Sequence, residues 1–138
     1  MVISETVKKQ FIEFIMLQVF DDQYIDRQEE KKILEEGIKK GISIDEGLAI
    51  IREIAYSKDF VIERDIEERT KEFLEQFIIN DGNINKKAFE TALVLFRSTS
   101  KAKVPEPEIK KRVKTIILDN CWKVKEGGLF GSKWFSEI

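Results

Sequence analysis

Apolar and polar residues recur along most of the chain with the period of an α-helix. The first stretch places one apolar face on a single helix: Val7, Phe11, Phe14, Ile15 and Val19. Four further apolar residues widen that face: Ile12, Met16, Leu17 and Phe20. Ser4 precedes the stretch and suits the N-cap position. We expect this helix to be buried on more than one side.

The same period predicts five more helices. Their approximate ranges are 27–40, 44–57, 64–79, 86–98 and 105–121. Asp26 with Glu29, and Ser43 with Glu46, have the spacing of a capping box, and Gly41 suits the left-handed position that ends a helix. Residues 58–63 read as a link, in which the apolar residues 60–62 fit the start of the fourth helix instead of a strand. The pattern therefore predicts an all-α fold.

A short acidic turn occurs twice, each time behind an apolar helix. The first turn contains Asp22, Ile25 and Asp26, and the second contains Asp81, Ile84 and Asn85 at the same spacing. The order of helices around the two turns is also the same. We therefore predict one helical domain over residues 1–121, built from two related three-helix units at 4–57 and 63–121.

Residues 122–138 form a tail of a different kind, rich in glycine and aromatic residues and without helical or strand periodicity. Its large apolar side chains are Trp122, Leu129, Phe130, Trp134 and Phe135. If the tail is pinned, Trp134 and Phe135 cover a groove in the helical body. If it is free, these side chains form an exposed patch of the kind that binds a partner.

Composition and charge narrow the range of possible functions. Apolar residues make up 42% of the 138 residues and charged residues 36%, which is typical of a compact helical protein. Residues 1–97 carry a net charge of about −6 and residues 98–138 about +4. Basic residues near the C-terminus are interleaved with aromatic ones, but they fit the solvated face of the sixth helix. We therefore expect no nucleic-acid binding, because nucleic-acid binders usually show a stronger basic excess.

The residue types that are missing exclude most catalytic chemistry. The chain has no histidine, which excludes Ser-His-Asp and Cys-His nucleophile systems and the usual zinc sites. The carboxylates are mostly interleaved with Lys and Arg at helical spacing, as on an exposed helix surface. One cysteine, no signal peptide and no apolar run near 20 residues indicate a cytoplasmic protein without a transmembrane segment. We expect no enzymatic activity.

The paired turns resemble EF-hand units, and they resemble still more the acidic turns of TerB-like helical domains, a family linked to tellurite resistance and metal-associated stress responses. The matching residues are Asp22, Ile25, Asp26, Glu29, Asp81, Gly82, Ile84 and Asn85. The resemblance implies a divalent cation at the first turn, with Asp22, Asp26 and Glu29 as ligands. Neither turn completes a calcium loop, because an EF-hand loop aligned on Ile84 lacks the bidentate Glu and one aligned on Ile25 has Phe20 at a ligand position.

Two functions follow from these patterns. The first is a non-enzymatic protein-interaction or regulatory module that binds another protein through a helical groove or through the aromatic tail, without a cofactor. The alternative is a TerB-like domain that binds a divalent metal weakly at the first acidic turn.

Overall fold

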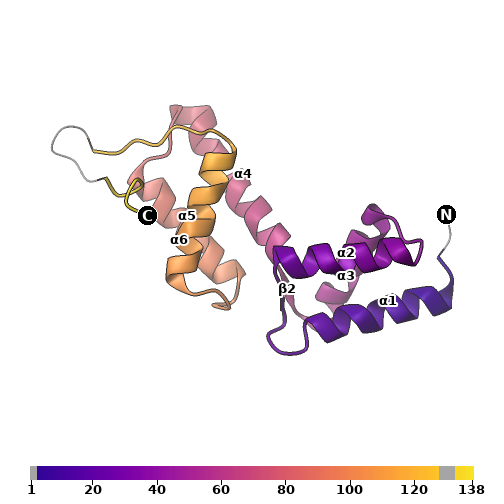
Figure 1. The fold of residues 1–138 in the computed structure, drawn as a ribbon. Coiled ribbons are helices and arrows are strands. Elements are labelled where there is room, and N and C mark those ends of the chain that lie inside the picture. Colours follow the sequence, from indigo (N-terminus) through magenta and orange to yellow (C-terminus); the bar gives the residue numbers. More distant parts are fainter. Residues whose placement is uncertain (1–2, 128–132) are drawn as a thin grey trace. The chain divides into compact units, whose positions relative to one another are not determined.

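The computed structural model of the protein describes residues 3–127 and 133–138. Within these residues the chain forms six helices and two very short strands (Figure 1). They are α1 (Glu5–Gln18), β1 (Tyr24–Ile25), α2 (Arg27–Lys39), α3 (Ile44–Lys58), β2 (Val61–Ile62), α4 (Glu63–Asp81), α5 (Lys86–Thr99) and α6 (Glu106–Asp119). The predicted all-α fold is confirmed.

The chain divides into two compact units, Met1–Arg64 and Asp65–Ile138, here called unit 1 and unit 2. The sequence predicted units at 4–57 and 63–121 and a separate tail. In the structure the division falls after the first two residues of α4, and the residues that follow α6 belong to unit 2.

Each unit is closed by a short parallel backbone pairing. In unit 1, β1 pairs with β2, with Ile25 opposite Ile62. In unit 2, Ile84 pairs with Val124 in the same parallel sense. The turn isoleucines of the predicted repeat therefore occupy equivalent positions, and each pairs with a residue that follows the third helix of its unit.

The third helix of each unit also ends in the same way. Asp59 after α3 and Cys121 after α6 adopt left-handed conformations with φ of 57° and 54°. The next N–H groups, those of Phe60 and Trp122, donate to carbonyls five residues earlier at 3.1 and 3.2 Å. This is a helix-ending motif that satisfies otherwise unpaired carbonyls. Phe60 and Trp122 are therefore equivalent residues.

Cys121 corrects one expectation. The sequence predicted that the sixth helix continues to residue 121, but α6 ends at Asp119, and Cys121 is exposed. The Nδ2 group of Asn120 donates to the carbonyl of Ile116 at 2.7 Å, so the chain turns away before residue 121.

The helix starts follow the sequence closely. Both predicted capping boxes are present, at Asp26–Glu29 and Ser43–Glu46, and Asn85 caps α5 through Ala88. Gly41 has φ of 84°, in the left-handed region. These contacts are local, which is why residue spacing alone identified them.

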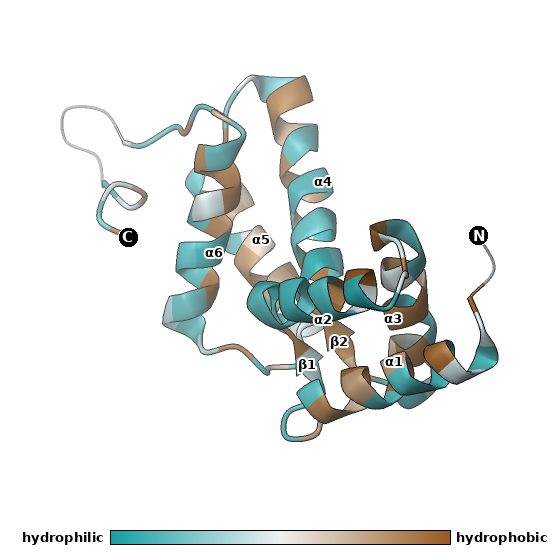
Figure 2. Cartoon of the chain, turned by 45° about the vertical axis from the view of Figure 1, so that its right-hand side comes forward, coloured by the Kyte–Doolittle hydropathy of each residue, from teal (hydrophilic) through white to brown (hydrophobic). Residues whose placement is uncertain are grey.

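Each unit has its own apolar core. The core of unit 1 is centred on fully buried side chains: Phe11, Ile15, Ile25, Ile33 and Ile51. That of unit 2 is formed by Leu74, Ile84, Phe89, Phe96, Ile109, Val113 and Ile117. Figure 2 shows apolar segments recurring along α1 and α3, with long hydrophilic stretches on α2 and α4. Among the described helices, none is long and apolar enough to cross a membrane.

Candidate functional site

The C-terminal half of α1 and the end of α3 enclose an apolar pocket within unit 1, here called the unit 1 groove. Its volume is about 550 Å³. It is lined by Ile12, Glu13, Met16, Leu17, Val19, Phe20, Gln23, Lys58 and Phe60. Six of these nine side chains are apolar, which is typical of a binding pocket rather than of a solvated surface.

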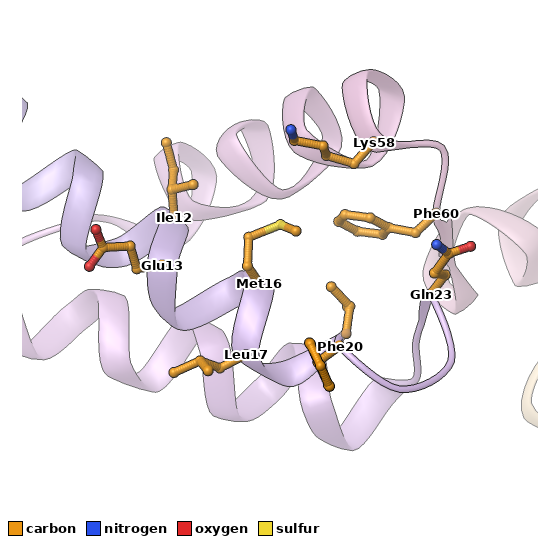
Figure 3. A pocket seen from close by; sticks show the side chains of 9 residues that line it. Ile12, Glu13, Met16, Leu17, Phe20, Gln23, Lys58 and Phe60 are labelled. Atoms are coloured by element: carbon orange, nitrogen blue, oxygen red, sulfur yellow. The ribbon is translucent and has the colours of Figure 1, made fainter.

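Helix geometry explains how the lining is assembled. Ile12, Met16 and Phe20 are spaced by four residues, so they follow one another along a single side of the helix and of the turn after it. The left-handed residue Asp59 then turns the chain so that Phe60 lies opposite that row. Figure 3 shows the side chains of Met16 and Phe60 pointing toward one another across the pocket.

The apolar surface continues beyond the pocket. Leu17 is 73% exposed and Phe20 is 83% exposed, although both belong to the lining. The sequence had predicted that α1 is buried on more than one side, and for these two residues the prediction is wrong. Large exposed apolar side chains beside an apolar pocket are typical of an interaction site.

The same positions in unit 2 show that the fold does not require this lining. The alignment of the two units that matches Ile25 with Ile84 also matches Ile12 with Lys71 and Met16 with Glu75. Unit 2 therefore carries two charged residues on the row where unit 1 carries its central apolar pair. The apolar character of the unit 1 groove is consequently a property of this site and not of the repeated architecture.

Acidic residues outnumber basic ones along the C-terminal half of α1 and the turn after it. Between Lys9 and Arg27 the chain contains four carboxylates and no basic residue: Glu13, Asp21, Asp22 and Asp26. The last turn of α1 also has no basic residue, so the partial negative charge of its carbonyl end is not balanced from within the helix. Lys58 is the one base in the lining.

The aromatic tail was the other predicted binding element, and the structure places its described part on unit 2. Phe135 is 8% exposed, and its ring lies 6.1 Å from that of Phe89, edge to face. Trp134 lies 5.1 Å from the same Phe89 ring. Trp122 is half-buried next to the Ile84–Val124 pairing. Leu129 and Phe130 lie outside the described residues.

Lys114 on α6 fixes the end of the tail. Its Nζ donates to the backbone carbonyls of Phe135 and Ile138 at 3.0 and 3.1 Å, and lies 4.9 Å from the centre of the Phe135 ring. The Ser136 hydroxyl donates to Glu126 at 2.5 Å. Of the two alternatives for the tail, these contacts favour the pinned one.

The three predicted metal ligands serve mainly as backbone acceptors. Asp26 Oδ1 accepts from the Glu29 N–H at 2.7 Å, Glu29 Oε1 accepts from the Asp26 N–H at 3.2 Å, and Asp22 Oδ1 accepts from the Tyr24 N–H at 3.2 Å. Across residues 3–127 and 133–138, no three acidic or cysteine side chains gather closely enough to hold a metal ion. A divalent site at this turn stays a prediction.

The pKa of Glu29 is nevertheless raised above its usual value. Partial burial raises the pKa of Glu29 to about 7, and repulsion from the carboxylates of Asp26 and Asp22 adds to the shift, while the backbone hydrogen bond from Asp26 opposes it. The acidic turn is therefore a place where negative charges lie close enough to disfavour one another.

Two buried carboxylates hold unit 1 together at the start of α4. Glu63 is fully buried, and its Oε2 accepts from the Tyr24 hydroxyl at 2.6 Å. Glu30, 2% exposed, pairs with Arg64 at 2.7 Å. These contacts join residues more than thirty positions apart, so no spacing in the sequence identified them.

The sequence predicted the unit 1 groove only in part. A helical groove was expected, but its residues were not named, and Phe60 was assigned to a link. The signal in the sequence was the excess of apolar residues at the end of the first helix, more than one buried face needs. In comparisons with protein-family models, with curated proteins and with solved structures, no match to this chain was found.

Proposed function

We propose that this chain is a non-enzymatic protein-interaction module and that the unit 1 groove binds an apolar segment of another protein. The observation that carries the proposal is the pairing of an apolar pocket of about 550 Å³ with two exposed apolar side chains on its rim, Leu17 and Phe20. Exposed side chains of this size gain free energy when a partner removes them from water.

A macromolecular partner suits the site better than a small molecule. A small molecule inside the pocket would contact Met16 and Phe60, but the outward part of Phe20 would stay in water. A protein segment can fill the pocket and cover the rim at once. Binding energy would then be concentrated on a few large apolar residues, as is usual at protein interfaces.

The other two candidate functions have less support. The tail covers part of unit 2 through Phe135, so those side chains are already engaged. The acidic turn gathers no three-ligand group among the described residues. Calorimetric titration with Ca²⁺, Mg²⁺ and Zn²⁺ tests the metal alternative, and heat that disappears in the Asp22→Ala, Asp26→Ala double variant would revive it.

Affinity capture from a lysate of the source organism tests the proposal with three baits. They are the unchanged protein, the Phe20→Ser variant and the Ile79→Ser variant. Ile79 is the matched control because it aligns with Phe20 in the repeat and because it is also exposed, at 68%. We expect a specific partner that is lost with Phe20→Ser and kept with Ile79→Ser. A partner kept by both variants would contradict the proposal.

A further inference from the structure

We infer that the segment bound by the unit 1 groove is an amphipathic helix with basic residues beside its apolar stripe. This inference rests on the proposed function and names the class of partner. It follows from the length of the apolar row, from the backbone chemistry of the groove walls and from the charge around the rim.

The apolar row on unit 1 has the length of a short helical stripe. Ile12 and Met16 lie about one helical turn apart in α1, and Phe20 continues the row into the turn after the helix. A partner helix with apolar residues at i, i+4 and i+7 likewise presents three anchors on successive turns. Such a stripe can place successive side chains along the row.

The walls of the groove favour a helix over an extended segment. The long wall is α1, a helix whose backbone groups are bonded within the helix except at the ends, and the facing side is formed by Lys58, the last residue of α3, and by Phe60. None of the lining residues belongs to β1 or β2, so an extended segment buried along α1 would find no strand in the lining to pair with, and its own N–H and C=O groups would lose their water partners. A helix satisfies its backbone internally, so it can be buried there at lower cost.

The rim charge selects a basic partner. Exposed carboxylates at Glu13, Asp21 and Asp22 lie along and just beyond the α1 wall. Unit 1 as a whole has ten basic and fourteen acidic residues, a net charge of −4. Lys or Arg side chains on the partner would meet these carboxylates and the unbalanced carbonyl end of α1.

The same charge argues against two other occupants. A second copy of this chain that docked through the same groove would bring its own acidic rim to it, and like charges across an interface are unfavourable. An anionic lipid surface would be repelled for the same reason. Both occupants are therefore outcomes that would overturn the inference.

Three synthetic peptides of about 18 residues supply the probe, labelled with fluorescein and measured by fluorescence anisotropy. The basic peptide has Leu and Phe at i, i+4, i+7 and i+11 with Lys and Arg on the flanks. The acidic peptide replaces every Lys and Arg with Glu. The broken peptide is the basic one with a central proline, which disrupts the helix. Each is titrated with the unchanged protein and with the variants Phe20→Ser, Ile79→Ser and the double variant Glu13→Gln, Asp21→Asn.

We expect the basic peptide to bind the unchanged protein at least about tenfold more tightly than either other peptide. The acidic peptide lacks the basic flanks, and the broken peptide lacks the continuous helix. Phe20→Ser should weaken it by about tenfold and Ile79→Ser should leave it unchanged. The double variant should weaken the basic peptide several-fold at about 50 mM salt and have less effect at about 300 mM, where charges are screened.

The outcomes separate the inference from the proposed function. If the acidic peptide binds as well as the basic one and Phe20→Ser weakens both, the groove binds protein but the charge preference is wrong. If the broken peptide binds equally well, the helical form is wrong. If no peptide binds and sedimentation shows a dimer that Phe20→Ser dissociates, the occupant is a second copy. If no peptide binds and the protein is a monomer, the inference fails, and the lysate capture decides the proposed function separately.

Discussion

Glu29 is the residue whose chemistry the surroundings change most clearly. Its pKa is raised from 4.5 to about 7, so the folded protein holds this proton over a range where the unfolded chain has already lost it. Between these values the native state binds more protons than the unfolded state, and stability falls as pH rises from about 4.5 to about 7. Because Glu29 is partly solvated, the effect is well below the full value of the shift.

Replacing Glu29 with Gln should remove this pH dependence. Gln keeps the capping-box position at N3 but carries no charge. We expect Glu29→Gln to melt at a higher temperature than the unchanged protein at about pH 8, and at about the same temperature near pH 3, where Glu29 is protonated in both states. Thermal denaturation followed by circular dichroism at the two pH values measures the difference.

Glu46 provides the matched control for that experiment. It occupies the same capping position in α3, but hydrogen bonds with Ser43 lower its pKa. Its charged form is therefore favoured by folding, and Glu46→Gln should leave stability unchanged or reduce it at about pH 8. A stabilisation by Glu46→Gln as large as that by Glu29→Gln would show that the acidic turn is not the cause.

Tyr24 is a second residue whose side chain has a measurable role in stability. It donates to the fully buried Glu63 at 2.6 Å. Tyr24→Phe should reduce the free energy of unfolding by about 1–3 kcal/mol, because a buried carboxyl loses a donor. Tyr56, which is 93% exposed, supplies the control, and Tyr56→Phe should change stability by less than about 0.5 kcal/mol. Equal effects in urea denaturation would contradict this account.

At the scale of the elements, the tail acts as a cover for unit 2. Phe135→Ala should reduce the free energy of unfolding by about 2–4 kcal/mol, because a buried aromatic side chain leaves a cavity beside Phe89. The basic-peptide affinity of the unit 1 groove should not change. Loss of partner binding with no loss of stability would instead identify the tail as the binding element.

The sequence predicted the elements well because their signals are local. The capping boxes at Asp26 and Ser43, the left-handed Gly41 and the helical periods all lie within a few residues of one another. The pairing of Ile25 with Ile62 joins distant residues and could not be read from spacing. The exposure of Phe20 could not be predicted either, since it depends on which helix faces α1 after folding.

At the scale of the whole molecule, two units of related architecture carry different surfaces. Unit 1 has a net charge of −4 and unit 2, with fourteen basic and twelve acidic residues, a net charge of +2. In the apolar row of unit 1, Ile12 and Met16 correspond to Lys71 and Glu75 of unit 2, while Phe20 corresponds to the apolar Ile79. The repeat thus preserves the helix order and the parallel pairing, while the lining of the unit 1 groove differs from its counterpart.

The most direct test of the central claim is photo-crosslinking at the groove in cells of the source organism. A benzophenone amino acid is placed at Phe20 in one protein and, as control, at Ile79 in another, two exposed and equivalent positions. We predict that position 20 gives a discrete crosslinked protein and that position 79 does not. The basic peptide should compete with this protein and reduce the crosslink at position 20. No crosslink from position 20, or the same products from both positions, would contradict a protein-binding groove in unit 1.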